Sequence, residues 1–141
     1  MGYWILILLV VIFFTFCFLR SKEKQEVSDR DKQAFLKIKS ILSDVCVAGV
    51  YYRTLDEISR IENLQEGEEL VLFREPDNSY DRNAIKVMTK DGYVIGYIPK
   101  NLCRLFNEIL AEYEYCIFVN RVSPGINAPY VYIRAIIKDL E

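Results

Sequence analysis

Three acidic side chains that could bind a divalent metal ion, Glu75, Asp77 and Asp81, lie close together in one turn-forming stretch. Carboxylate oxygens are the ligands that hard cations such as Ca²⁺ and Mg²⁺ prefer. Asp77 and the neighbouring Asn78, however, belong to the residue types that build turns by hydrogen bonding to nearby backbone amides. Because turn capping explains these residues without a ligand, the sequence favours a turn and predicts no bound metal or cofactor.

The chain lacks the residues that most enzyme mechanisms need. It contains no histidine, so a Ser-His or Cys-His pair cannot be assembled. It also lacks a Gly-x-x-x-x-Gly-Lys phosphate loop and a Gly-x-Ser-x-Gly nucleophile motif. No Cys-x-x-Cys pair with zinc-ligand spacing is present, and free thiols in a reducing compartment explain the cysteines better than disulfides do. We therefore predict a binding protein, not an enzyme, in which four thiols are unpaired: Cys17, Cys46, Cys103 and Cys116.

The net charge of −2 hides an asymmetry along the chain. Residues 20–43 carry seven Lys or Arg against four Asp or Glu, which gives +3, whereas residues 44–141 carry eleven against sixteen, which gives −5. Affinity for nucleic acid comes largely from the neutralisation of phosphates. An acidic domain is therefore untypical of a general nucleic-acid binder, and any such contact should be small and local.

The segment from Tyr3 to Leu19 contains no charged residue and is rich in Ile, Leu, Val and Phe. As a helix it would extend about 25 Å, at the short end of what crosses a bilayer. No basic residue precedes it and no small-residue cleavage site follows it, which disfavours a cleaved signal peptide. Arg20, Lys22 and Lys24 follow directly. We therefore predict a single-pass anchor in a lipid bilayer, with the C-terminal domain in the cytoplasm.

The segment that follows the anchor is basic. Residues 21–30 are polar and predict a linker, and Ser28 or Asp29 could cap a helix that ends near Ser43. Its apolar residues recur at helical spacing. A basic amphipathic helix on anionic lipid is one interpretation, but the short apolar stripe favours a stalk. The predicted parts are an anchor at 3–19, a basic linker and amphipathic helix at 20–43, and a folded domain at 44–141.

The folded domain alternates short apolar runs with turn residues, as strands do. A helix or turn is expected at Leu55–Leu64, and Pro99 should start a helix at Asn101–Glu112. Six short strands with so few helices predict a mainly β (α+β) fold, a small OB- or SH3-like barrel. The strands are expected at Val45–Tyr52, Glu69–Arg74, Ala84–Met88, Tyr93–Ile98, Glu114–Arg121 and Tyr130–Lys138.

The run from Phe73 to Ile98 is specific enough to suggest a family. It reads Phe-Arg-Glu-Pro-Asp-Asn-Ser-Tyr-Asp-Arg-Asn-Ala-Ile-Lys-Val, followed after Gly92 by Ile-Gly-Tyr-Ile-Pro-Lys. This run resembles the core signature of the HIRAN domain, and Ala48 to Tyr52 resembles the first strand of that family. The resemblance extends over about Val45 to Lys138, nearly all of the folded domain.

The resemblance implies an OB-like barrel that grips the 3′ end of single-stranded DNA. It implies that Asp81 accepts a hydrogen bond from the 3′-hydroxyl and that Lys100 meets a phosphate. Tyr51 best matches a phosphate-contacting arginine of the family, with Arg53 close by. Aromatic rings would be supplied by Tyr52, Tyr80, Tyr97 and, in the last loop, Tyr130.

Two functions from different classes are compatible with these residues. The first is a binding module for single-stranded nucleic-acid ends, held at the inner face of a membrane. The second is a membrane-anchored protein-interaction module that has kept the barrel and lost the nucleic-acid site. Tyr80, Asp81 and Asn83 fit both, because the same residues could simply build the turn.

Overall fold

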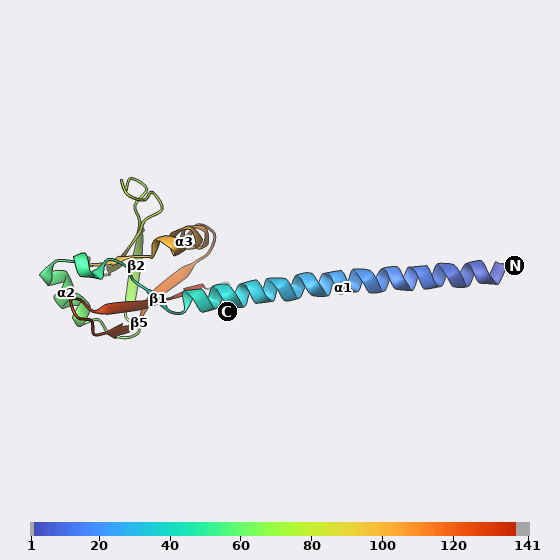
Figure 1. The fold of residues 1–141 in the computed structure, drawn as a ribbon, viewed down its shortest axis with the longest axis horizontal. Helices are drawn as coiled ribbons and strands as arrows, with labels where there is room; N and C mark the ends of the chain where they lie inside the picture. Colours follow the sequence, from blue (N-terminus) through green and yellow to red (C-terminus); the bar gives the residue numbers. More distant parts are fainter. Residues whose placement is uncertain (1, 138–141) are drawn as a thin grey trace. The chain divides into compact units, whose positions relative to one another are not determined.

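The computed structural model describes the backbone of residues 2–137 and the side chains of residues 12–26 and 28–137. Two compact units divide the chain between Lys39 and Ser40. The first unit is helical, and the second contains the β-sheet and the remaining helices (Figure 1).

Helix α1 runs without interruption from Gly2 to Leu42. The prediction of a linker at residues 21–30 is therefore wrong, and neither Ser28 nor Asp29 starts a new helix. The physical reason is composition, because Lys, Glu, Gln and Arg are good helix formers and no Gly or Pro interrupts this stretch. Glu26 and Arg30, one turn apart, add an ion pair with a 3.6 Å distance between Oε2 and Nη2.

The predicted membrane span falls partly outside the described residues. Residues 3–11 are helical, but their side chains are not described. Among the residues that are described, no helix is long and apolar enough to cross a membrane. The anchor at residues 3–19 therefore stays a prediction.

The second unit is built on a six-stranded sheet in which all paired neighbours are antiparallel. The prediction of a mainly β fold with six strands and a few helices is confirmed; the last residue of the predicted final strand, Lys138, lies outside the described residues. In spatial order the strands are β1 (Val45–Cys46), β6 (Tyr130–Ile137), β5 (Tyr115–Ser123), β2 (Glu69–Arg74), β3 (Ile85–Thr89) and β4 (Val94–Tyr97).

The two edges of this sheet meet next to β1, so the sheet curls into a half-barrel. The Val47 amide donates to the Val131 carbonyl on β6, and Ala48 and Tyr97 of β4 exchange two backbone hydrogen bonds of 2.8 Å each. Gly96 makes this approach possible, because a Cβ on it would lie 2.3 Å from the Ala48 carbonyl oxygen. A glycine inside a strand commonly marks such a close backbone contact.

The first predicted strand is much shorter than expected. We predicted a strand from Val45 to Tyr52, but β1 ends at Cys46 and residues Val50–Tyr52 form a short 3₁₀ helix, η1. Gly49 causes the break, because its φ of 77° is left-handed and incompatible with a continuing strand. The turn at Gly49 places Tyr51 and Tyr52 on a helical turn at the surface instead of on the sheet.

The core of this unit is lined by alternating residues of the strands and by buried residues of its two α-helices. In β3, for example, Ile85, Val87 and Thr89 are buried while the residues between them are partly exposed. Helix α2 (Leu55–Glu62) begins with a capping box between Thr54 and Glu57. Helix α3 (Lys100–Glu112) buries three side chains against the sheet: Cys103, Phe106 and Ile109.

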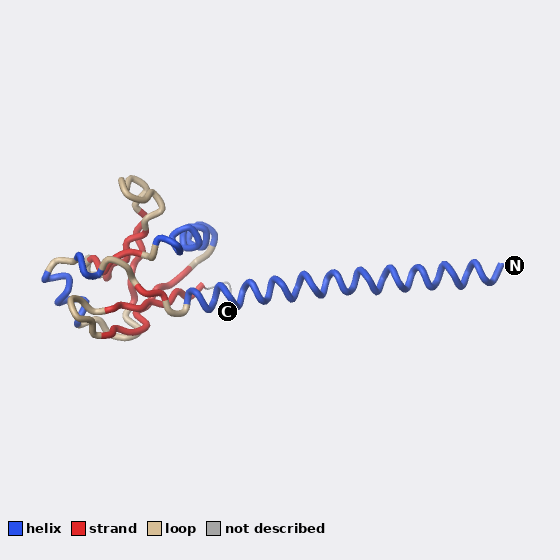
Figure 2. The backbone as a smooth tube through the Cα atoms, in the orientation of Figure 1, coloured by secondary structure: helices blue, strands red, loops and turns tan. Residues whose placement is uncertain are grey.

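The segment between β2 and β3 is an irregular loop that stands clear of the sheet (Figure 2). It contains residues 75–84, the stretch in which the sequence placed its acidic and aromatic candidates. We refer to residues 75–84 as the β2–β3 loop.

Candidate functional site

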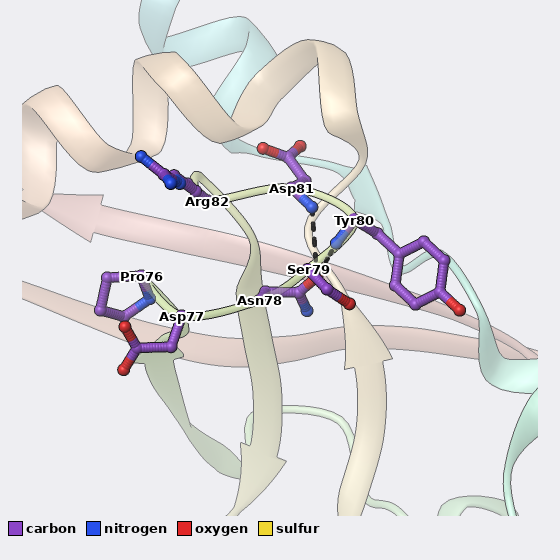
Figure 3. A pocket seen from close by; sticks show the side chains of 7 residues that line it. All are labelled: Pro76, Asp77, Asn78, Ser79, Tyr80, Asp81 and Arg82. Carbon is purple, nitrogen blue, oxygen red and sulfur yellow. Dashed lines mark hydrogen bonds between the residues drawn. The ribbon is translucent and has the colours of Figure 1, made fainter.

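The β2–β3 loop is organised by the side chain of Asn78. Its Oδ1 accepts hydrogen bonds from the backbone amides of Tyr80 at 2.9 Å and Asp81 at 3.1 Å (Figure 3), and its Nδ2 donates to Glu75 Oε2 at 2.9 Å. An asparagine that satisfies two amides in this way fixes a turn without regular secondary structure. The Tyr80 ring consequently projects from the loop and is 95% exposed.

Asp81 serves the turn with one of its two carboxylate oxygens. Asp81 Oδ1 accepts the Asn83 backbone amide at 2.8 Å, and the Asp81 carbonyl accepts the Ala84 amide at 3.0 Å. Asn107 on α3 donates to the Asn83 carbonyl at 3.0 Å and so ties the loop to that helix. Within the described residues no hydrogen bond engages Asp81 Oδ2. The carboxylate is therefore partly structural and partly available.

An open groove of about 900 Å³ lies beside the loop. Three parts of the fold form it: the chain on both sides of Gly49, the β2–β3 loop, and the junction of β4 with α3. It brings together six of the eight residues that the sequence nominated: Tyr52, Arg53, Tyr80, Asp81, Tyr97 and Lys100.

Tyr51 and Tyr130, the other two nominated residues, do not line this groove. The Tyr51 ring packs edge-on against Tyr52, with 5.4 Å between ring centroids and 75° between ring planes. Tyr51 thus contacts a residue of the groove without lining the groove itself. Tyr130 is half exposed at the start of β6, where Gly125 approaches its ring closely.

Arg53 is the cation most deeply set in the groove. Its Cζ lies 5.9 Å from the centroid of the Tyr97 ring, which it can attract through a cation–π interaction. Its Nε is buried and has no hydrogen-bond partner among the described residues. Buried donors are normally satisfied, so this atom has capacity for an acceptor.

Lys86 and Glu75 form an ion pair at the edge of the groove that the sequence analysis did not predict. Lys86 lies directly across the β3–β4 ladder from Tyr97. Hydrogen bonds from the Lys86 ammonium, the larger cause, and from Asn78 lower the pKa of the Glu75 carboxyl. The hydrogen bond to Glu75 in turn raises the pKa of Lys86. Glu75 therefore stays ionised but neutralised, and it adds little negative potential to the groove.

The cysteines and the carboxylates near the groove form no reactive or metal-binding cluster among the described residues. Burial raises the pKa of the Cys103 thiol, so it stays protonated at neutral pH, and all four cysteines are free. In the part of the chain that the structure describes, no three metal-ligating side chains gather in one place. Of the three acidic residues in the loop, Glu75 is an ion-pair partner and Asp81 is a turn-building group.

The comparisons with known proteins identify the family of the domain that carries this groove. The family model of the HIRAN domain matches residues 42–137. The chain belongs to the HIRAN domain family. HIRAN domains are known in general as DNA-binding modules rather than catalytic ones.

The region that matches this chain covers a different share of each relative. A Fanconi-associated nuclease 1 homolog of Arabidopsis thaliana is 34% identical over 58 residues, which are 41% of this chain and 6% of that protein. A crystal structure of a protein from Lactobacillus plantarum is 25% identical, with a TM-score of 0.55, over 67% of this chain and 92% of that one. The HIRAN domain of human HLTF is 24% identical, with a TM-score of 0.48, over 69% of this chain and 77% of that one.

Proposed function

We propose that this HIRAN domain binds the free 3′ end of single-stranded DNA in the groove beside the β2–β3 loop. The observation that carries the proposal is the convergence of three tyrosines, two cations and one half-free carboxylate on a single open groove. These groups come from separate parts of the chain, and none of them is fully buried in the folded domain. Packing in the core therefore does not account for them.

The exposed rings suit bases of any identity. Tyr52 and Tyr80 are 79% and 95% exposed, so their packing contributes little to the core. A base stacked on an aromatic ring contributes about 1–3 kcal/mol, and this contribution tolerates any sequence. Together with Tyr97, these rings are suited to binding the end of a DNA strand whatever its base sequence.

The cations of the groove can offset the acidity of the domain locally. Arg53 has an unpartnered buried Nε, and Lys100 takes part in no ion pair within the described chain. The first turn of α3 also borders the groove, and the N-terminal end of a helix attracts phosphate. Because the rest of the domain is acidic, we expect weak binding to internal DNA segments and strong dependence on salt.

Asp81 gives the groove a reason to prefer a terminal hydroxyl. Its unengaged Oδ2 can accept a hydrogen bond from a 3′-hydroxyl, whereas a phosphate at the same place would be repelled by the charge. A carboxylate at this position therefore favours a free end and disfavours both a blocked end and a continuous strand.

The test is a titration of the full chain, in mild detergent at low salt, with two short oligonucleotides. Both carry a dye at the 5′ end, and one ends in a 3′-hydroxyl while the other ends in a 3′-phosphate. We expect fluorescence anisotropy to show at least about tenfold tighter binding of the hydroxyl form. Equal affinity for both, or no binding of either, would contradict the proposal; the latter would favour the protein-interaction function instead.

Asp81→Asn is the matched variant for this test. Asparagine keeps a side-chain oxygen that can accept the Asn83 amide, so the turn survives while the charge is lost. We expect the preference for the 3′-hydroxyl to shrink toward equality with little change in the free energy of unfolding. A variant that unfolds more easily but keeps its preference would assign Asp81 to the turn alone.

We also infer that residues 3–19 tether the domain to a membrane, with the domain on the cytoplasmic side. Four phenylalanines and one leucine within residues 13–19 are more than half exposed, and Arg20 and Lys22 lie over the rings of Phe16 and Phe18. In a flotation assay the full chain should rise with liposomes, and a chain lacking residues 3–19 should not. Equal flotation of both would contradict the tether.

A further inference from the structure

A second hollow, of about 720 Å³, adjoins the groove across the β2–β3 loop. Residues 73–80 line it, and it shares Asn78 and Tyr80 with the groove. At its far side lies Phe73, the second-last residue of β2, whose ring is 57% exposed. A large exposed aromatic side chain on a strand calls for an explanation, since folding alone gains little from it.

Phe73 lies in register with Tyr97, which lines the groove. It pairs with Lys86 on β3, and Lys86 pairs with Tyr97 on β4, so the three side chains share one face of the sheet. Neighbouring strands are about 5 Å apart, which puts the Phe73 and Tyr97 backbones roughly 10 Å apart. A strand of DNA that starts in the groove can cross that distance within a few nucleotides.

The charges around Phe73 are compatible with such a strand. Lys86 Nζ lies 5.8 Å from the centroid of the Phe73 ring and neutralises Glu75. Arg74 also lines this hollow, and its guanidinium donates a 2.9 Å hydrogen bond from Nη2 to the Asn107 carbonyl on α3. Asp77 is the remaining carboxylate there, and it disfavours a phosphate next to it. With Glu75 neutralised, the hollow therefore suits a base stacked on the Phe73 ring.

We propose that Phe73 is a further stacking residue, which binds a base a few nucleotides upstream of the 3′ end held in the groove. The inference rests on the proposed function, and it makes the binding footprint longer than the groove itself. Tyr80 stands between the two hollows and is shared by both.

The test compares unlabelled oligothymidylates of increasing length, each with a free 3′-hydroxyl, by calorimetric titration into the full chain. The natural chain should gain affinity from the dinucleotide to the hexanucleotide. Phe73→Ala should remove most of that gain, about fivefold or more, while changing dinucleotide affinity by less than about twofold. Phe73→Tyr should restore the gain, because it keeps the ring.

Val71→Ala is the matched control. Val71 is also exposed on the outer face of β2, two residues from Phe73, but does not line the hollow. It should leave every affinity unchanged. Equal losses for short and long oligomers in Phe73→Ala, or no loss for either, would overturn the inference while leaving the proposed function intact. If the natural chain binds no oligomer at all, both proposals are wrong.

Discussion

The two ends of the β2–β3 pair use similar side chains in opposite ways. At the end where β2 begins and β3 connects to β4, the charged side chains form ion pairs with one another. Arg60 contacts Glu68, and its Nε lies 3.0 Å from Asp91 Oδ2, while Lys90 pairs with Glu69. The contacts of Arg60 with Asp91 and of Lys90 with Glu69 tie together segments that are distant in the sequence. This end of the sheet is held closed by its charges.

The opposite end, at the β2–β3 loop, leaves comparable groups uncommitted. Arg53 has a buried Nε without a partner among the described residues, and Asp81 engages one oxygen of two. Tyr52 and Tyr80 present their rings to solvent. The loop is held by the amide side chain of Asn78, together with one ion pair between Glu75 and Lys86. Residue type alone does not distinguish a structural charge from a binding charge; the presence of a fixed partner does.

Replacing both exposed rings at the open end should have the largest effect. The double change Tyr52→Ala and Tyr80→Ala removes two stacking surfaces of about 1–3 kcal/mol each, so affinity for a single-stranded oligomer should fall on the order of a hundredfold. Because both rings are mostly exposed, the free energy of unfolding should change little. Tyr93→Ala, at the closed end, is the control and should leave affinity unchanged; a comparable loss there would erase the contrast between the two ends.

Arg53→Ala should weaken binding less, by about tenfold, because it removes one charge-assisted contact. Arg53→Lys should recover only part of this loss, since a lysine cannot place a donor where the buried Nε lies. Anisotropy titrations at two salt concentrations should show a shallower salt dependence for Arg53→Ala. An unchanged salt dependence would mean that Arg53 meets no phosphate.

Arg60→Ala should show the reverse pattern at the closed end. Loss of the contacts with Glu68 and Asp91 should lower the free energy of unfolding by about 1 kcal/mol, as expected for a partly exposed ion-pair network. Urea unfolding followed by circular dichroism measures this. DNA affinity should stay within about twofold of the natural chain. A large loss of affinity would show that the two ends are coupled.

The smallest expected effect is an acid-dependent loss of stability at the closed end. The Arg60 hydrogen bond, then that of Thr89, lowers the pKa of Asp91 from 3.8 to about 2. Because the folded state binds this proton less tightly than the unfolded chain, the group contributes stability above about pH 3.8 that is lost as pH falls through about 2. Asp91→Asn should flatten this part of the stability profile between about pH 5 and about pH 2. An unaltered profile would contradict the role given to Asp91.

Much of the fold was predictable because its signals are local. The bounds of β2 are those predicted, and α3 begins one residue earlier than expected, directly after Pro99. The first strand was predicted wrongly because an apolar run does not reveal that Gly49 adopts a left-handed conformation. The continuity of α1 was missed because a polar composition was interpreted as a linker, although its residues favour helix.

The site was predictable in its residues but not in its assembly. Six nominated side chains share the groove, and the family resemblance covers all three parts of the chain that present them. The ion pair between Glu75 and Lys86 and the exposed ring of Phe73 were missed. Strand alternation places Lys86 on the face of β3 away from the buried Ile85 and Val87. That alternation could have predicted that Lys86 is available for an ion pair. No sequence pattern showed that Arg53 would lack a partner, because that depends on segments brought together by folding.

The location of the bound strand tests the account most directly. Amide chemical shifts of the full chain, recorded in detergent by nuclear magnetic resonance during titration with a short oligomer bearing a free 3′-hydroxyl, report which end is contacted. We predict shifts concentrated at Tyr52, Tyr80, Asp81 and Lys100, with Arg60 and Asp91 unchanged. Shifts centred on Arg60 and Asp91, or spread evenly over both ends, would contradict the proposal that the open end is the binding site.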